Sequence, residues 1–230
     1  MISKTRDKDF KKGILLIDKP VGITSHDVVD IARKRLKFRK IGHAGTLDPL
    51  AEGLLVLLVG SYTKKFEKFV SFDKKYFGTL KLGEVTHTGD SEGEVLKQKE
   101  WKHISESQIK KTVESFQGAV EQVPPMVSAL RQKGQRLYKL ARKGVTIKRK
   151  PRKIKIYSCS LERVRLPYLD FYVHCSKGTY IRKLAEDIGD KLGCGAYATK
   201  IVRKKIGPFD LKDSIKPKNI NEAYLQEFSF

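Results

Sequence analysis

The stretch at residues 41–59 constrains the fold most, because it places a polar, glycine-rich loop directly before a buried strand. Residues 41–53 have the sequence IGHAGTLDPLAEG, and residues 54–59 form the continuous apolar run LLVLLV. A short apolar run bounded by turn residues is typical of a buried strand. Gly42 and Gly45 let the backbone before Asp48 turn sharply, and Pro49 restricts Asp48 to extended geometry. The sequence therefore predicts a carboxylate, that of Asp48, on a stiff loop beside the hydrophobic core.

Two roles fit Asp48 on local chemistry alone. Asp-Pro is a common turn pair, so the side chain can simply cap a turn. A carboxylate on a loop positioned by rigid elements can equally act as a nucleophile or general base. Local sequence leaves both roles open.

The charge of the chain indicates a polyanionic partner. Its 230 residues include 48 Lys and Arg against 26 Asp and Glu, a formal charge of +22. A field of this size attracts nucleic acid. A membrane surface is the competing partner, but no stretch approaches the roughly 18 apolar residues of a membrane-spanning helix. With 40% hydrophobic residues, the chain can still bury a sizeable core.

The cysteines and histidines show no metal-binding pattern. Cys159, Cys175 and Cys194 form neither a paired framework nor a CxxC motif, which indicates reduced thiols in a cytoplasmic protein. Residues 1–12 are basic and lack the apolar segment of a signal peptide. No metal-ligand spacing and no glycine-rich phosphate loop is visible, so we expect no metal and no cofactor.

Hydrophobic periodicity predicts alternating strands and helices, and by itself it indicates only an α+β class. Ser25 is the expected cap of the first helix, and a Ser105–Gln108 capping box is expected to start a later one that ends near residue 117. After residue 209 there is room for one short helix at most. The expected strands lie at 13–17, 54–59, 75–82, 153–166, 168–174 and 196–206, and further helices at 61–70, with Phe66 facing inward, and 179–192.

Two polar segments interrupt this pattern. Residues 83–93 are polar, and we expect a solvated loop there. Residues 124–153 are densely basic, with a short helix expected around Leu137, Leu140 and Ala141. Because apolar and aromatic residues alternate with the charges, an RNA-gripping segment is favoured over a disordered charged loop.

Four motifs, together spanning about residues 13 to 209, carry a family resemblance. They are LIDKPVGITS at 16–25, GHAGTLDPLAEGLLVLLVG at 42–60, the segment 75–83, and CSKGTYIR at 175–182. In this order they resemble the TruB family, the tRNA pseudouridine synthases that modify the T-loop uridine.

The resemblance implies a pseudouridine synthase fold, in which a central mixed, mostly antiparallel sheet is flanked by helices. It implies a single catalytic domain over residues 1–230, with a thumb-like basic insertion at about 124–153 that grips the T-arm of tRNA. Because most members carry a C-terminal RNA-binding PUA domain, for which this chain is too short, we expect no such domain here. The implied protein is a monomeric cytoplasmic isomerase that needs no cofactor.

Against the solvated loop expected at 83–93, the resemblance implies an acidic turn there. It also assigns roles to residues. It makes Asp48 the nucleophile, Arg182 the cation that keeps Asp48 charged and directed, and Tyr76 and Tyr180 aromatic supports. A stacking ring at His43 would offset part of the cost of flipping the base out of its stack. The residues implied to bind substrate are His43, Lys19, Pro20, Gly45, Thr46, Ile201, Arg131, Arg136 and Arg142.

Without the resemblance, simpler explanations hold for several of these residues. Arg182 is then a helix-surface arginine, Tyr76 and Tyr180 are packing residues, and His43 is a loop histidine bonded to nearby backbone. The chain also departs from the family pattern: Val127 stands where a tyrosine is common, and Ile201-Val202-Arg203 lacks one arginine.

A different functional class also fits the charge of the chain. A basic RNA chaperone or ribosome-associated protein on the same fold would bind RNA without turnover. A synthase that acts on another RNA is a third alternative. The presence of Asp48, Tyr76 and Arg182 together favours the enzyme, because binding alone does not require all three.

Overall fold

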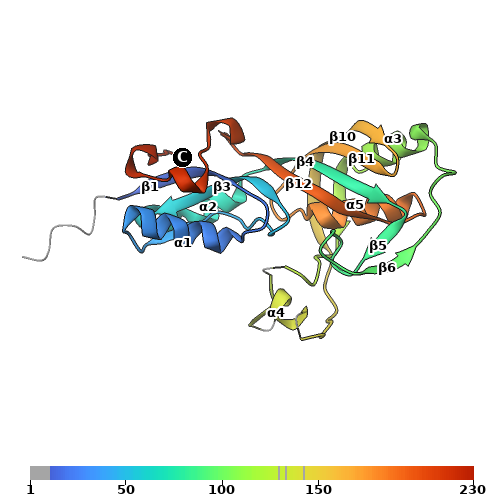
Figure 1. Ribbon diagram of the computed structural model, residues 1–230, viewed down its shortest axis with the longest axis horizontal. Helices are drawn as coiled ribbons and strands as arrows, with labels where there is room; N and C mark the ends of the chain where they lie inside the picture. Colours follow the sequence, from blue (N-terminus) through green and yellow to red (C-terminus); the bar gives the residue numbers. More distant parts are fainter. Residues whose placement is uncertain (1–10, 129, 133, 142) are drawn as a thin grey trace, which may run out of the picture. The chain divides into compact units, whose positions relative to one another are not determined.

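The structure, a computed structural model, describes residues 11–128, 130–132, 134–141 and 143–230, in two compact units (Figure 1). Unit 1 contains the described residues up to Phe72 together with Val202–Phe230, and unit 2 contains Asp73–Ile201. Strand β12 (Ala196–Ile206) runs through the boundary, so it contributes to the sheet of each unit. The expected organisation as one catalytic domain over 1–230 stays a prediction.

The sheet of unit 1 is mixed. Strand β3 pairs antiparallel with β1 and β2 and parallel with β12, in the register Val202 to Glu52. Six consecutive residues of β3, Leu54–Val59, are at most 1% exposed, which confirms the predicted buried strand. The elements of unit 1 are β1 (Gly13–Lys19), α1 (Ser25–Leu36), β2 (Ile41–His43), β3 (Glu52–Val59), α2 (Phe66–Ser71) and β13 (Phe209–Asp210).

Helix α1 begins one residue earlier than predicted. Thr24, not Ser25, is the cap: its side chain accepts from the Asp27 N–H, while the Asp27 carboxylate accepts from the Thr24 N–H. The expected cap was wrong because Ser25 is buried and bonds instead to both backbone groups of Leu47. A hydroxyl predicted to close a helix therefore anchors a distant loop.

Two further expectations for unit 1 need correction. The segment 61–70 is a 3₁₀ helix, Gly60–Lys65, followed by the short helix α2, and Phe66 is 41% exposed rather than inward. Phe69 fills the core position instead. After Phe209 the chain forms three one-turn 3₁₀ helices, at Leu211–Asp213, Pro217–Asn219 and Glu222–Tyr224.

The sheet of unit 2 has the strand order β12-β4-β11-β10-β7. Its pairings β4–β11, β10–β11 and β7–β10 are antiparallel, so with the parallel pair of unit 1 the predicted mixed, mostly antiparallel sheet is confirmed. The elements of unit 2 are β4 (Lys74–Leu82), β5 (Glu84–Thr86), β6 (Val95–Gln98), α3 (Glu106–Glu114), β7 (Gly118–Gln122), β8 (Arg131–Gln132), β9 (Gln135–Arg136), α4 (Leu137–Ala141), β10 (Arg152–Arg165), β11 (Tyr168–Cys175) and α5 (Ile181–Lys191).

Local sequence signals determine much of this unit. The β10–β11 hairpin turns at Pro167 as predicted, and the Ser105–Gln108 capping box starts α3. Strand β4 alternates as expected, with Tyr76 and Leu80 buried. Helices α3 and α5 contact β10 and β4, and the hydrophobic core of unit 2 lies between these helices and the sheet.

The segment 83–93 is not the solvated loop that its polarity suggested. It contains β5, which pairs with β6 across the turn at 87–93. Asp90 in that turn is only 3% exposed and forms a parallel bridge with Ala198 of β12. Gly89 and Asp90 of this turn are buried because the Asp90 carboxylate meets a buried cation, whereas His87 and Glu92 remain exposed.

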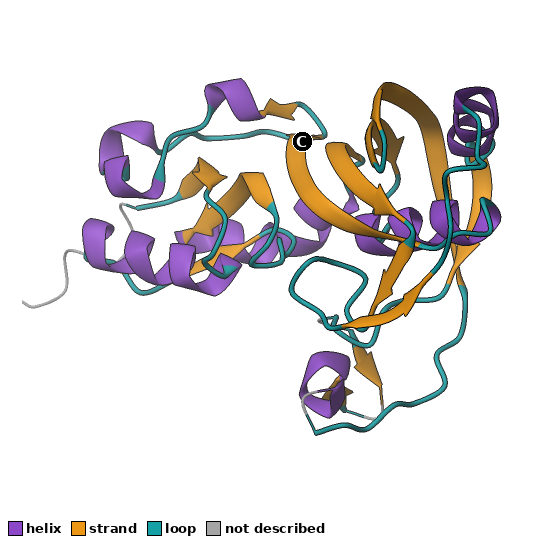
Figure 2. Ribbon diagram, turned by 45° about the vertical axis from the view of Figure 1, so that its right-hand side comes forward, coloured by secondary structure: helices purple, strands orange, loops and turns teal. Residues whose placement is uncertain are grey.

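The basic segment 124–153 projects from the sheet of unit 2 on two long loops (Figures 1 and 2). It carries the short β8–β9 hairpin and α4. The predicted short helix is confirmed, and Leu137 in it is buried.

Candidate active site

The predicted site residues fall into two groups, one in each unit. Unit 1 holds Asp48 and the loop around it, with His43, Lys19 and Pro20. Unit 2 holds Tyr76, Tyr180, Arg182 and Ile201, together with the basic segment.

The loop that carries Asp48 is held by hydrogen bonds both before and after Asp48 in the chain. On one side, Ala44 N–H donates to Val56 O at 2.8 Å, and Leu47 N–H donates to the Ser25 hydroxyl at 2.8 Å. On the other, Pro49 O accepts from Gly22 N–H at 2.9 Å. The half-buried Asp48 therefore has fixed neighbours before and after it. Pre-positioning of this kind is what a nucleophilic carboxylate requires.

Arg203 of β12 also fixes this loop, and the sequence did not identify it as a site residue. It is 2% exposed, and its guanidinium donates to Leu54 O at 2.7 Å, Gly45 O at 3.1 Å and Thr46 O at 3.3 Å. Gly53 explains the close approach: its φ is +101°, and a Cβ there would lie 2.5 Å from Arg203 O. The sequence signal was weak, because Arg203 is one of four cations in the strand Ala196–Ile206.

Lys19 is completely buried at the end of β1. Its ammonium donates to Ile23 O at 2.7 Å and Pro20 O at 2.8 Å, with a longer contact to Pro49 O at 3.5 Å. Burial lowers the pKa of Lys19 to about 8, although the Asp48 carboxylate raises it, and Arg203 lowers it further. Lys19 and Pro20 thus form a turn that borders the Asp48 loop.

The other predicted residues of unit 1 line the same loop. His43 is half-buried at the end of β2, opposite Leu57. Gly45 has a φ of +104°, a conformation that favours glycine. Thr46 is exposed. Their predicted contacts with substrate stay predictions.

In unit 2, Arg182 lies on α5 but is not the surface residue that its isolated sequence position suggests. It is 3% exposed and donates to Val127 O at 2.7 Å and Thr88 O at 2.8 Å. Its guanidinium also lies 3.3 Å from the Asp90 carboxylate. These contacts hold the guanidinium in one orientation.

The turn that presents Asp90 is itself hydrogen-bonded. Asp90 accepts from the Thr88 hydroxyl and, at 3.1 Å, from the Glu92 N–H, while its carbonyl accepts from the Thr86 hydroxyl at 2.8 Å. Asp90 is therefore a functional candidate that sequence reasoning assigned to a loop. The available signal was the spacing of Thr86, Thr88 and Asp90, since threonine and aspartate side chains bond local backbone in turns.

The two predicted tyrosines differ in position. Tyr76 is 8% exposed on β4, opposite Val173. Tyr180 precedes α5 as its N-cap residue, and the buried Gln122 side chain bonds both its backbone groups. Ile201, the predicted apolar floor residue, is 4% exposed on β12.

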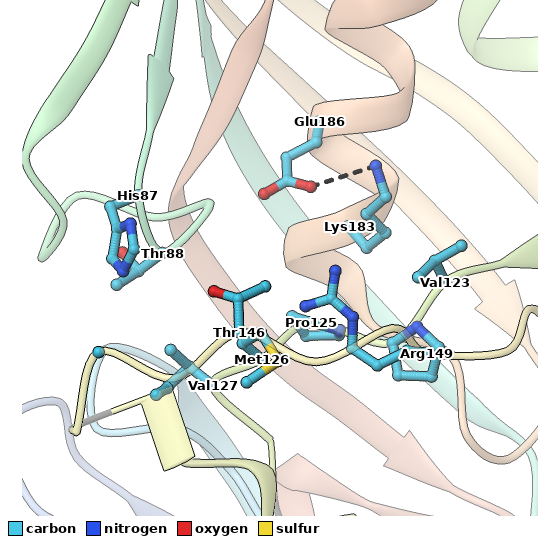
Figure 3. Close-up of a pocket in the computed structure, with 13 residues that line it drawn as sticks. His87, Thr88, Val123, Pro125, Met126, Val127, Thr146, Arg149, Lys183 and Glu186 are labelled. Atoms are coloured by element: carbon cyan, nitrogen blue, oxygen red, sulfur yellow. Dashed lines mark ion pairs between the residues drawn. The ribbon is translucent and has the colours of Figure 1, made fainter. Parts of the chain in front are cut away.

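A pocket of about 460 Å³ lies beside the Arg182 contacts in unit 2 (Figure 3). Thr88 and Val127, whose carbonyls bind Arg182, are among its lining residues. Lys183 and Glu186 project into it from α5, joined by a 3.2 Å ion pair. Burial raises the pKa of Glu186, opposed by Lys183.

The arginines predicted to grip RNA lie in the projecting segment. Arg131 and Arg136 pair with each other in the β8–β9 hairpin. Arg142 lies outside the described residues.

The described part of the chain offers neither a metal-ligand cluster nor a membrane-spanning helix. It contains no group of three or more His, Cys, Asp or Glu side chains placed to hold a metal ion. None of its helices is long and apolar enough to cross a membrane.

Comparison with protein families matches nearly the whole chain. Residues 33–181 match the N-terminal domain of the TruB family pseudouridylate synthases, and residues 182–228 match the tRNA pseudouridylate synthase B C-terminal domain. The chain is 47% identical over 216 residues to tRNA pseudouridine synthase B of Clostridium tetani, covering 94% of this chain and 75% of that protein. Its identity to the Opitutus terrae protein of the same name is 44% over 215 residues, covering 94% and 88%.

Solved structures agree on the fold. A Cbf5-Nop10-Gar1 complex matches with a TM-score of 0.69 and 29% identity, over 89% of this chain and 52% of that chain. An H/ACA RNP bound to a substrate RNA containing 2'-deoxyuridine matches with a TM-score of 0.66 and 27% identity, over 90% and 51%. The chain thus spans about half the length of these solved chains, and the predicted pseudouridine synthase fold is confirmed.

Proposed function

This chain belongs to the TruB family of pseudouridylate synthases, and on that premise we propose that it isomerises the T-loop uridine of tRNA to pseudouridine. The observation that carries the proposal is the half-buried Asp48 on a loop fastened before and after the carboxylate. Curated relatives that cover most of this chain bear the name tRNA pseudouridine synthase B.

In the proposed reaction, the Asp48 carboxylate attacks either the sugar carbon or the base ring, and the glycosidic C–N bond breaks. The detached uracil rotates and rejoins the ribose through carbon, and the bond to Asp48 breaks. The carbon that forms the new bond loses its proton, and the nitrogen released from the ribose gains one. Product and substrate contain the same atoms, so the reaction consumes no oxidant, reductant or water. A positioned carboxylate suits this chemistry because a covalent intermediate divides one difficult step into two easier ones.

The remaining residues are proposed to hold the flipped nucleotide. Arg182 orients the nucleophile, Tyr76 stacks on the uracil or assists proton removal, and Tyr180 positions the base. His43 fills the space that the flipped base leaves in the RNA stack, offsetting part of the unstacking cost of a few kcal/mol.

Substrate recognition is assigned to the basic segment 124–153 and to the overall charge. The protein acts as a monomer on the T-arm, which the arginines of that segment, Arg131, Arg136 and Arg142, grip through phosphates. Contacts to phosphates supply much of nucleic-acid affinity.

The proposal is tested with an unmodified tRNA transcript in which pseudouridine is mapped nucleotide by nucleotide. We expect conversion confined to the T-loop uridine, and its loss in Asp48→Asn. The control Asp213→Asn changes an exposed aspartate of unit 1 and should convert normally. Conversion at another position would keep the chemistry and overturn the substrate.

Tight binding without any conversion by the unmutated protein would favour the chaperone alternative.

A further inference from the structure

The sheet of unit 2 has an outer face whose residues have no role in the proposed reaction. Successive strand residues point to opposite faces, so Tyr76 and Phe77 of β4 lie on different sides. The Tyr76 side also carries Leu80 and Phe171, which are completely buried. We call the other side the outer aromatic face; it comprises Phe77, Tyr157, Tyr168, Tyr172 and His174, with the cations Lys75, Lys81, Lys155, Arg163 and Arg165.

Strand register brings the aromatic side chains of this face together. Tyr172 is opposite Phe77, and their ring centroids lie 5.3 Å apart in an edge-to-face arrangement. His174 lies opposite Lys75, and its ring is 4.7 Å from that of Tyr157. Tyr172 is 39% exposed and Tyr168 41%, so two ring systems on one strand remain open to solvent.

The charge around these rings is positive. Lys75, Lys155 and Arg163 are exposed, and the Lys155 ammonium lies 5.2 Å from the centroid of Tyr157. The nearby Asp170 does not offset them, because it is 6% exposed and bonded by the Thr79 hydroxyl at 2.7 Å and by Arg165 at 2.8 Å.

Three further acids border the face, and Glu84 is paired with Lys81 at 2.6 Å. Asp73 accepts from the Tyr157 hydroxyl at 3.2 Å, and Glu162 accepts from the Ser160 hydroxyl at 2.9 Å. The five cations of the outer aromatic face still outnumber the four acids beside it, which are Asp73, Glu84, Glu162 and Asp170.

We propose that the outer aromatic face is a second RNA-binding surface that takes an unpaired stretch of RNA, with bases stacked on Tyr172 and Tyr168 and phosphates held by the surrounding lysines and arginines. Aromatic rings on an open sheet, interleaved with cations, match the two needs of a single strand: a flat apolar partner for each base and positive charge along the backbone. The charge complementarity favours RNA over a protein partner.

The first test locates bound RNA on the protein. A short oligouridine that carries photoreactive 5-iodouridine is cross-linked to the full chain while an excess of an unlabelled T-arm stem-loop occupies the proposed catalytic surface. We expect cross-links in peptides that contain Tyr168 and Tyr172. Cross-links confined to other peptides would overturn the proposal.

The second test measures affinity under the same conditions. Because stacking contributes roughly 1–3 kcal/mol per base, we expect the double variant Tyr168→Ala/Tyr172→Ala to bind the oligouridine at least about tenfold more weakly. Tyr168→Phe/Tyr172→Phe retains the rings and should bind normally. Tyr224→Ala is the matched control, because this tyrosine of unit 1 is 43% exposed. Affinity equal to that of the unmutated protein in the alanine variant would reject the proposal.

Charge and activity provide separate checks. Replacing Lys75 and Lys155 by alanine should reduce the slope of log affinity against log salt by roughly one to two. Conversion of the stem-loop should be unchanged in the tyrosine variants, so this surface and the proposed reaction can fail independently. If the alanine variant instead loses self-association in sedimentation and keeps RNA affinity, the face binds a second copy of the chain and the proposal is wrong.

Discussion

The Gln122 side chain holds both backbone groups of Tyr180. Its Oε1 accepts from Tyr180 N–H at 2.8 Å, and its Nε2 donates to Tyr180 O at 3.1 Å. Gln122 is 2% exposed at the end of β7, so water cannot readily replace it. One amide thereby fixes the residue that precedes α5, two positions before Arg182.

The first prediction concerns this pairing. Gln122→Leu removes the partner of the Tyr180 N–H and leaves the Tyr180 carbonyl bonded to the Leu184 N–H at 3.0 Å, so the free energy of unfolding should fall by about 1–3 kcal/mol. Urea unfolding measures this change. Gln117→Leu, at an exposed glutamine that follows α3, should stay within about 0.5 kcal/mol of the unmutated protein. Equal stabilities of the two variants would contradict the assigned role of Gln122.

The second prediction concerns Asp90 and Arg182. Asp90→Asn keeps an oxygen that can accept from Thr88 and Glu92 but removes the negative charge 3.3 Å from the guanidinium. We expect kcat to fall by roughly tenfold to a hundredfold, because small displacements of catalytic groups have effects of this size. KM for tRNA should change little.

Steady-state kinetics on a tRNA transcript provides the measurement for Asp90→Asn. Glu92→Gln, at an exposed residue of the same turn, is the control and should leave kcat unchanged. A rise in KM with kcat intact would mean that Asp90 contributes to binding instead.

The third prediction concerns Arg203. Arg203→Met removes the donors to Leu54, Gly45 and Thr46, and the three carbonyls lose their partner. The free energy of unfolding should fall by about 3 kcal/mol or more, and kcat should fall because the Asp48 loop is no longer held. Arg203→Lys keeps the charge but cannot reach three acceptors, so it should recover only part of both losses. Unchanged kcat in a folded Arg203→Met protein would exclude a positioning role.

The fourth prediction is a pH dependence caused by Lys19. The pKa of its ammonium is about 8 in the folded chain and 10.5 when unperturbed. Between these two values Lys19 is protonated in the unfolded chain and largely neutral in the folded chain. The cost of burying the charge is present in full below about pH 8 and disappears as pH rises to about 10.5. Relative to Lys19→Met, the unmutated protein should therefore gain stability across that window.

Denaturant unfolding of both proteins between pH 7 and 10 measures the Lys19 effect. Taking the difference cancels the titration of other groups, such as Cys159 and Cys175, whose pKa burial raises to about 12. A difference that does not vary with pH would show that Lys19 titrates normally.

Sequence alone determined the features that depend on neighbours in the chain. The apolar run at Leu54–Val59, the Ser105–Gln108 capping box and the hairpin at Pro167 each follow from local periodicity, hydrogen bonding or turn chemistry, and each lies where predicted. The Asp48 loop follows only in part from local sequence: its glycines permit sharp turns and Pro49 restricts Asp48, whereas its hydrogen bonds to Ser25 and Arg203 come from distant segments.

Only the tertiary structure decided which polar groups are buried, because a buried polar group depends on partners far along the chain. In the sequence, Asp90 belongs to a polar turn; in the structure it forms a buried ion pair with Arg182, which lies on a distant helix. In the sequence, Ser25 is a plausible helix cap; in the structure its hydroxyl accepts from the Leu47 N–H instead. Arg203 gains its role only where β12 meets the carbonyls of the Asp48 loop. Once such a group is buried and loses its water, it must have a hydrogen-bond or ion-pair partner. The neighbouring residues in the sequence do not indicate which distant residue that partner is.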